Sequence, residues 1–215
     1  MRTMAIFTFS AAALLLGGCD LIGIRGNGHV VTDQRTIGEI SQIYSRGAFK
    51  VEWRSGPPSL SITTDENLLR YIDSQTIGNR LELRTHERLR PTHSIKVVVS
   101  SPTRTGAKLS GATDLIAHGL SGPKFVIQGS GACDITLDGA VDEFLADLTG
   151  ASDVRAKGLQ TKSAEISATG ASDVSISVSE TLRVSITGAG DVKYYGNPKT
   201  IEKHVTGAGS IHHKD

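Results

Sequence analysis

The sequence predicts an all-β protein that folds as a single-chain parallel β-helix, a solenoid with about 19–20 residues per coil. Three observations support this fold class. A Gly-Ala motif returns at a nearly fixed spacing, apolar residues alternate with polar ones around it, and the chain is rich in glycine (24 of 215 residues) but poor in aromatic residues (5%). A fixed period near 20 residues is typical of stacked repeats that each cannot bury an apolar face alone.

The repeat covers residues 105–215 and is defined by a glycine that is followed by alanine. The spacings between successive motif glycines are 20, 19, 20, 18 and 19 residues. The six glycines are Gly111, Gly131, Gly150, Gly170, Gly188 and Gly207. Six copies in half of a chain indicate one structural unit used repeatedly.

Apolar residues alternate with polar residues on both sides of each motif, which indicates strands with one buried face. The position four residues after the glycine is always aliphatic: Leu115, Ile135, Val154, Val174, Val192 and Ile211. We predict two short strands per repeat, with a second turn around Gly119, Gly139, Gly158 and Gly196. At the end of the chain, Tyr194, Lys203 and His213 occupy inward positions, so the last coil is predicted to be frayed or to form a cap.

The first half of the domain is less regular. An alternating stretch at 47–53 carries its own Gly-Ala pair and is predicted to be a degenerate first coil. Asp65 can cap a short α-helix from Glu66 to about Ile72. Strands are expected at 60–64, 81–83 and 95–99, with turns at 56–58 and 78–79. We predict that these elements cap one continuous domain over residues 37–215.

An N-terminal targeting segment precedes this domain. Arg2 is followed by an apolar stretch at 5–16, which is too short for a membrane span of about 20 residues but typical of a signal peptide. The sequence Leu16-Gly17-Gly18-Cys19 resembles a bacterial lipobox, in which the cysteine is acylated and becomes the N-terminus after cleavage. We predict a signal peptide at 1–18, a lipid anchor at Cys19 and a tether at 19–36, with an ordinary secretory signal or a short anchor helix as the alternatives.

The lipobox predicts a bacterial cell-envelope protein, anchored on the periplasmic side of the inner membrane or on the outer membrane. The formal net charge is +1, from 23 basic and 22 acidic residues, which excludes a polybasic nucleic-acid binder as the default. With Cys19 acylated, Cys133 has no partner for a disulfide, and we expect it to be a small buried side chain at a turn.

Three features occur together in this chain: the lipobox, the opening around Asp65-Glu66-Asn67-Leu68-Leu69 and the iterated Gly-Ala-x-Asp-Val repeats. In this combination the chain resembles the bacterial GIN-domain family of adhesin heads. The resemblance covers roughly residues 38–215. It implies a right-handed β-helix and an envelope location. It implies no catalytic activity and no family catalytic residues.

One aspartate per repeat forms the sharpest candidate site: Asp114, Asp134, Asp153, Asp173 and Asp191, with Ser210 ending the column. Neighbouring carboxylates at about 5 Å repel by about 0.8 kcal/mol in water, so something must offset the repulsion. We expect each carboxylate to accept backbone N–H bonds in its own turn. The alternative is a Ca²⁺ site, because this cation binds carboxylate oxygens at 2.3–2.6 Å. No other metal or cofactor is indicated.

The side chains of Arg155 and Lys193 lie two residues after an aspartate and are expected to project on the same outward face, and Tyr195 is expected to face outward as well. These three residues form the candidate binding face, and charge compensation is the alternative role for the two cations. A basic stretch at 80–104 is expected to be a solvated surface or a contact for anionic lipid or envelope polymer. His204, His212 and His213 are expected to belong to a loose polar tail.

Three classes of function follow, in decreasing order of support. The first is a non-catalytic, adhesin-like module that binds envelope polysaccharide or a surface protein through its flat faces. The second is an assembly protein that pairs through the exposed ends of the solenoid. The third is a carbohydrate-active enzyme, which is disfavoured because the acidic and basic residues recur with the repeat and do not gather into one cluster.

Overall fold

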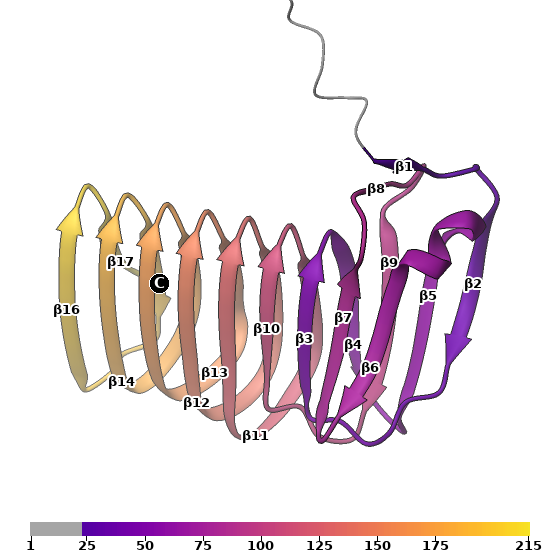
Figure 1. Ribbon diagram of the computed structural model, residues 1–215. Helices are drawn as coiled ribbons and strands as arrows, with labels where there is room; N and C mark the ends of the chain where they lie inside the picture. Colours follow the sequence, from indigo (N-terminus) through magenta and orange to yellow (C-terminus); the bar gives the residue numbers. More distant parts are fainter. Residues whose placement is uncertain (1–22) are drawn as a thin grey trace, which may run out of the picture.

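The computed structural model describes residues 23–215, so the predicted signal peptide and Cys19 lie outside the described residues. Fifteen strands form one sheet that winds into a solenoid, and two further strands, β1 (Ile24–Arg25) and β8 (Leu89–Arg90), pair with each other at its N-terminal end. The coils stack along a single axis toward the C-terminal strands (Figure 1). The predicted all-β parallel β-helix is confirmed.

The regular coils are long strands that pair in parallel with the coils on either side. They are β11 (Asp114–Gly131), β12 (Asp134–Gly150), β13 (Asp153–Gly170) and β14 (Asp173–Gly188). The short strand β10 (Gly106–Gly111) precedes them and pairs in parallel with the end of β11. Equivalent residues of the repeat face one another, as Val154 faces Val174. The predicted division of each coil into two strands is wrong for β11–β14, because the chain stays extended through the bend and only shifts register there, as between Ala117 and Leu120. It is confirmed at the C-terminal end, where β15 (Asp191–Tyr195) and β16 (Thr200–Gly207) are separate strands.

A glycine ends each coil because the backbone at that point leaves no room for a side chain. Gly170 has a φ of +117°, and a Cβ atom on it would lie 2.3 Å from the carbonyl oxygen of Gly150 in the preceding coil. The equivalent glycines of the other coils also have positive φ values and the same close approach. The stacked turns therefore require glycine once per repeat.

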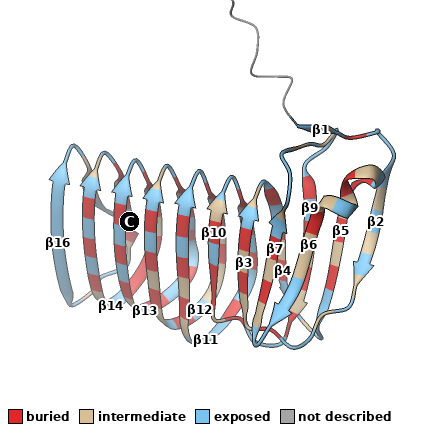
Figure 2. Cartoon of the chain, viewed as in Figure 1, coloured by how far each residue is buried: buried red, intermediate tan, exposed pale blue. Residues whose placement is uncertain are grey.

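The interior of the solenoid is filled by ladders of aliphatic side chains. Buried and exposed residues alternate along each long strand, as the banding in Figure 2 shows. Phe125 and Phe144 are fully buried and face each other in register, and the ring of Trp53 lies 6.2 Å from that of Phe125. Cys133 is buried, which confirms its expected role as a packed side chain.

The predicted first coil is confirmed. Strands β3 (Gln42–Gly47) and β4 (Phe49–Ser55) pair in parallel with β10 and β11, and Gly47 lies in register with Gly111. On their other side lie β7 (Arg80–Thr85) and β9 (Ile95–Ser101), which also pair in parallel with them. Residues 80–101 therefore form a coil outside the first coil, although they come later in the sequence.

Antiparallel strands close the N-terminal end. β5 (Ser59–Asp65) pairs with β9 and with β2 (Val30–Arg35), and β6 (Ile72–Ile77) pairs with β7. The predicted α-helix is wrong in type, because Glu66–Tyr71 forms a 3₁₀ helix, η1, between two strands that leave room for only six residues. The expected tether at 19–36 is too long, because β1 and β2 lie within it and are hydrogen-bonded to β8 and β5.

The C-terminal end has a much thinner closure. β15 (Asp191–Tyr195) and β17 (Ser210–Lys214) stack on one side of the solenoid, and β16 (Thr200–Gly207) pairs with β14 on the other. All eight residues of β16 are exposed. The ring of His213 stacks on the ring of Tyr194 at 5.0 Å, and Lys203 Nζ lies 4.9 Å from the centre of the same ring. These side chains cover the end of the last coil, as expected for a cap.

Candidate functional site

Two outward faces of the solenoid carry the polar side chains. The Asp face is the outer side of β4, β9, β15 and β17 and of the opening segments of β11–β14, where the aspartates lie. The hydroxyl face is the outer side of β7, β3, β10 and β16 and of the closing segments of β11–β14. Its top row consists of hydroxyl side chains in register: Ser110, Ser130, Thr149, Thr169, Thr187 and Thr206.

The five aspartates of the predicted column are brought together on the Asp face. Asp134, Asp153 and Asp173 are paired in register on three successive strands. Each of the five carboxylates has a partner that offsets the repulsion between neighbours. Lys50 Nζ lies 3.6 Å from Asp114, and the Arg155 guanidinium contacts both Asp134, at 3.6 Å, and Asp153.

The two remaining carboxylates accept hydrogen bonds from the following coil. The backbone N–H of Asp191 donates to Asp173 Oδ1 at 3.0 Å, and that of Ser210 donates to Asp191 Oδ1 at 3.1 Å. The hydroxyl of Ser210 also donates to Asp191, and this bond together with the Ser210 N–H lowers the pKa of the Asp191 carboxyl. The expectation that each carboxylate bonds within its own turn is therefore wrong, because stacking brings the next coil's N–H closer.

The column does not gather carboxylates in the way that a metal site requires. Within residues 23–215, no three His, Cys, Asp or Glu side chains are grouped so that they could hold a metal ion. The aspartates lie in a single file, one per coil, and two of them share Arg155. Ca²⁺ takes six to eight oxygen ligands, so a bound ion would need ligands beyond this file.

The three predicted binding residues, Arg155, Lys193 and Tyr195, all lie on the Asp face, but they do not form one cluster. Arg155 on β13 is in register with Ser175, which in turn is in register with Lys193 on β15, so the two cations are two strands apart. Lys157 Nζ lies 4.1 Å from the centre of the Tyr195 ring and covers part of it. Arg155 acts in charge compensation, while Lys193 is exposed and makes no ion pair with a described residue.

The predicted basic stretch at 80–104 is divided among several environments. Arg104 is buried, and its guanidinium donates to the carbonyl oxygens of His118, at 2.8 Å, and Gly119, at 2.6 Å, so it supports the bend of β11. Arg80 and Arg84 lie on the hydroxyl face, where they pair with Glu82 and Asp73. Arg88 and Arg90 lie in and beside β8, at the N-terminal end.

A cationic hollow on the hydroxyl face was not visible in the sequence pattern. It measures about 280 Å³ and is lined by Tyr44, Arg46, Glu82, Arg84, Lys108 and Ser110, among others. The Arg80 guanidinium lies 4.4 Å from the centre of the Tyr44 ring, and Lys108 Nζ lies 5.9 Å from it. Aligning Gly47 with Gly111 in the sequence would have placed Tyr44 beside Lys108. The position of β7 could not be found in this way, because β7 lies between β3 and β10 in the sequence but on the far side of β3 in the structure.

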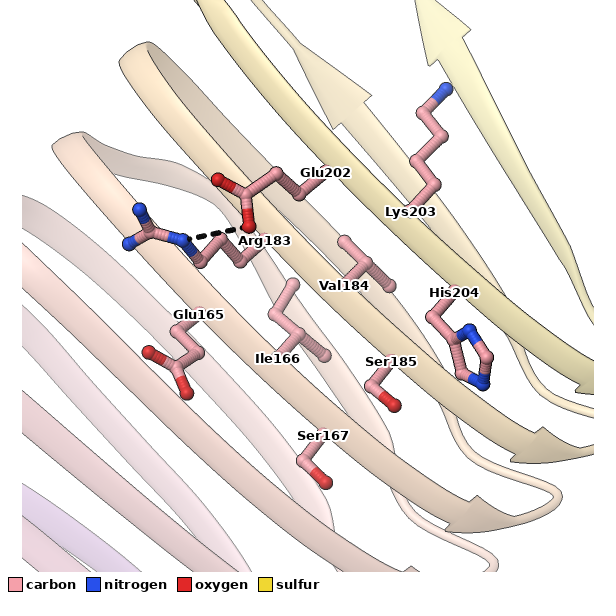
Figure 3. Close-up of a pocket in the computed structure, with 9 residues that line it drawn as sticks. All are labelled: Glu165, Ile166, Ser167, Arg183, Val184, Ser185, Glu202, Lys203 and His204. Carbon is pink, nitrogen blue, oxygen red and sulfur yellow. Dashed lines mark hydrogen bonds and ion pairs between the residues drawn. The ribbon is translucent and has the colours of Figure 1, made fainter.

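A second hollow, of about 330 Å³, lies at the C-terminal end of the hydroxyl face. Two outward rows line it, Glu165–Arg183–Glu202 and Ser167–Ser185–His204, each drawn from three successive strands (Figure 3). Arg183 Nε lies 3.1 Å from Glu202 Oε2. The hollow is a shallow part of the sheet surface, with polar side chains along it.

His118 and Asp138 form an imidazole–carboxylate pair near the buried Arg104. Among the described coils, no other such pair adjoins a buried arginine. The backbone N–H of Gly119 donates to Asp138 at 2.6 Å, and this bond and the contact with His118 lower the pKa of the Asp138 carboxyl. The nearby Arg104 guanidinium is engaged by backbone carbonyl groups. The cluster therefore secures the bend between the two faces.

The matching family model is described as "putative auto-transporter adhesin, head GIN domain" and covers residues 40–198. A comparison with curated proteins found no match. None of the helices among the described residues is long and apolar enough to cross a membrane.

Solved structures share the fold. A "putative adhesin" from Bacteroides fragilis is 20% identical, with a TM-score of 0.74 over 89% of this chain and 100% of that one. A "putative lipid binding protein" from Parabacteroides distasonis is 22% identical, with a TM-score of 0.54 over 89% and 99% of the two chains. A "putative adhesin" from Parabacteroides merdae is 20% identical, with a TM-score of 0.54 over 90% and 100%. At these identities the likeness concerns the fold.

Proposed function

This chain belongs to the family described as "putative auto-transporter adhesin, head GIN domain", and from that premise we propose that it is a non-catalytic, lipid-anchored binding module of the bacterial cell envelope. The family assignment supports a cell-surface or envelope protein with an adhesin-like role. Acylation at Cys19 is the finer part of the proposal, and it rests on the lipobox at residues 16–19.

The observation that carries the proposal is the long, flat array of outward side chains. Parallel stacking places equivalent polar residues in rows along the whole solenoid, and the hollows on these faces are shallow. A small-molecule site is usually a concave, largely apolar pocket with a few polar groups. An extended polymer or the surface of a protein matches a flat polar face better.

Within this proposal, the Asp face near the C-terminal coils contacts the partner. Lys193 offers an exposed cation, and Tyr195 offers the part of its ring that Lys157 leaves uncovered. The partner class is an envelope polysaccharide or a surface protein, because hydroxyl-rich and charged groups can bond to these rows. A carbohydrate-active enzyme is the least supported alternative, since the acidic and basic residues of this face neutralise one another along the coils.

A retention assay tests the proposal. The chain beginning at Asp20, which contains every described strand, is incubated with purified peptidoglycan, lipopolysaccharide or intact cells, with and without Ca²⁺. We expect saturable retention on one of these surfaces. Retention that needs Ca²⁺ would indicate that the aspartate column is a cation site. Absence of retention on all three surfaces would overturn the binding function. Mass spectrometry of the envelope fraction tests acylation separately.

A second function, assembly through the C-terminal edge, is favoured by the exposure of β16. Its outer edge is unpaired among the described strands, and Ile201 and Val205 are 41% and 40% exposed. A free edge with apolar side chains is a template for pairing with another strand, here β16 of a second copy. Val205→Pro should abolish such a dimer in analytical ultracentrifugation, whereas binding through the Asp face should survive this change.

A further inference from the structure

Two exposed cations line the cationic hollow without a counter-ion. Arg46 lies on β3 and Lys108 on β10, and neither makes an ion pair with any residue in 23–215. The strands β7, β3 and β10 lie side by side (Figure 1), which places Arg46 between Arg84 on β7 and Ser110 on β10. Lys108 lies beside Tyr44 on β3. Three cations on three neighbouring strands therefore border one hollow.

The like charges of Arg46 and Arg84 lie in register, an arrangement that destabilises a sheet unless a counter-charge offsets it. Arg84 has a counter-charge, because its Nη2 atom lies 3.1 Å from Asp73 Oδ2 on the neighbouring strand β6. Arg46 has none, since the residue on its other side is Ser110. On the Asp face, by contrast, Arg155 contacts two neighbouring carboxylates. The hollow therefore lacks the anion that such an arrangement calls for.

The charge balance around the hollow is positive. The strands β6, β7, β3 and β10 carry six charged side chains, four cations and two carboxylates: Arg46, Arg80, Arg84, Lys108, Asp73 and Glu82. Glu82 pairs with Arg80 at 2.7 Å, and Asp73 pairs with Arg84, which leaves a surplus of two positive charges. The next carboxylate in the row of Lys108 is that of Asp147, two strands away.

The side chains around the hollow suit a tetrahedral oxyanion. A guanidinium group presents two parallel N–H donors to a phosphate or carboxylate, and the Arg46 side chain has no other described partner for them. The Ser110 hydroxyl, which also lines the hollow, adds a neutral donor. The Tyr44 ring is held in place by the Arg80 guanidinium, 4.4 Å from its centre. The hollow thus combines free charge with a positioned wall.

A smaller hollow adjoins the cationic one and gives room for the group that carries the anion. It measures about 150 Å³, shares Tyr44 and Lys108 with the cationic hollow, and continues over Gly106, Val126 and Gln128. Its floor is part apolar, and Gln128 can donate or accept a hydrogen bond. Such a surface suits a sugar ring, which has both C–H groups and hydroxyls.

We propose that the cationic hollow binds a phosphate monoester carried by a saccharide. A phosphate monoester has a charge of about −1.5 to −2 near neutral pH, which matches the surplus of two positive charges, whereas a carboxylate supplies only one negative charge. The site lies on the hydroxyl face, so it goes beyond the function proposed for the Asp face. A free sugar phosphate and a phosphorylated envelope glycan share this chemistry.

A titration followed by nuclear magnetic resonance tests the site. The ¹⁵N-labelled chain beginning at Asp20 is titrated at low salt with glucose 6-phosphate or with glucose, at about pH 7.5, above the second pKa of phosphate near 6. We expect saturable amide shifts on β3, β7 and β10 with the phosphorylated sugar and none with glucose. Absence of saturable shifts with glucose 6-phosphate, or equal shifts with glucose, would overturn the proposal.

Two matched double variants locate the binding. Loss of a hydrogen bond to a charged group weakens binding by about tenfold or more, so Arg46→Gln, Lys108→Gln should bind glucose 6-phosphate at least tenfold more weakly. The control Arg25→Gln, Arg88→Gln removes two exposed cations at the N-terminal end and should bind like the unmodified chain. An equal loss in both variants would overturn the proposal, because it would reduce the effect to net charge. The amide spectra report whether each variant is folded.

Phosphorylated dextran distinguishes the two sources of the ligand, with unmodified dextran as the neutral polymer. Tighter binding per phosphate group to the phosphorylated polymer than to glucose 6-phosphate supports the site and assigns it to a glycan chain. Equal binding per phosphate group supports the site and assigns it to a free sugar phosphate. Equal binding to the unmodified polymer would overturn the requirement for phosphate and with it the proposal.

This site and the proposed function can fail separately. Retention through the Asp face depends on Lys193 and Tyr195, whereas binding of glucose 6-phosphate depends on Arg46 and Lys108. If the amide shifts hold but envelope surfaces do not retain the chain, the phosphate site stands and the proposed function fails. If retention holds but the hollow shows no shifts, the proposed function stands and the phosphate site fails.

Discussion

The regular coils and the N-terminal end of the solenoid use the same kind of strand but secure it differently. In the coils, each contact is repeated: a glycine turn, an aliphatic ladder and a partner for each aspartate return with every repeat. At the N-terminal end, single residues hold the structure, chiefly the buried Asp65 and the Asn67 side chain. The comparison teaches that repetition tolerates the loss of a polar contact but not of a turn glycine, whereas the N-terminal end depends on particular polar residues.

The largest effect should come from a turn glycine. Gly170→Val places a Cβ atom 2.3 Å from the Gly150 carbonyl oxygen at a φ of +117°, and the backbone strain and overpacking together should cost about 3–5 kcal/mol. Chemical denaturation monitored by circular dichroism measures the loss. Gly78→Ala is the control, because Gly78 has a φ of +61° with open space around it and should cost only about 1 kcal/mol. Equal losses at the two sites would refute the stacking explanation.

The next effect should come from the N-terminal end. Asp65→Ala removes the acceptor for the N–H groups of Gly28 and Thr92 and for the Thr92 hydroxyl, and should cost about 3 kcal/mol. The matched control is Asp142→Ala, which removes an exposed ion pair with Lys162 and should cost less than about 1 kcal/mol. A loss at Asp65 no greater than that of the control would show that this end does not depend on its single carboxylate.

Acid should weaken the N-terminal end through the same residue. Burial opposes ionisation of Asp65, but the hydrogen bonds from Thr92 and Gly28 outweigh it and lower the pKa of its carboxyl. A group whose pKa is lower in the folded state stabilises the protein above its unfolded value, near pH 3.9, and loses that contribution as the pH falls through the folded value. Unfolding measured against pH should therefore show a steeper loss of stability below about pH 4 in the unmodified chain than in Asp65→Asn.

The smallest effect should come from the aspartate column. Asp153→Asn removes one repulsion on each side together with the ion pair to Arg155, so the free energy of unfolding should change by less than about 0.5 kcal/mol. Thermal unfolding with and without added salt measures the change. A loss above about 2 kcal/mol would mean that the column is held by something other than its described partners.

Much of the fold followed from the repeat. The glycine spacing located every coil from β10 onward, and the Gly-Ala pair at residues 47–48 located the first coil, because local pattern and stacking agree there. The coil formed by β7 and β9 could not be found in this way, since it lies beside β3 and β4 only through contacts distant in sequence.

The candidate site was predictable in part for the same reason. The aspartates share a position in the repeat, so the sequence placed them in one column, and Arg155 and Lys193 on the same face. The hydrogen-bond donors to Asp173 and Asp191 lie in the next coil, which spacing alone does not resolve. The hollow around Tyr44 and Lys108 combines the first coil with the reordered β7, so no single stretch of sequence contains it.

Retention on envelope surfaces tests the central claim, that the coils bind a partner through the Asp face. The chain beginning at Asp20 and its variant Lys193→Glu, Tyr195→Ala are compared on whichever of peptidoglycan, lipopolysaccharide or intact cells retains the chain most strongly, with Arg88→Glu at the N-terminal end as the control. We predict saturable retention that falls at least tenfold in the Asp-face variant and is unchanged in the control. Retention that is equal in all three chains would contradict binding through the Asp face.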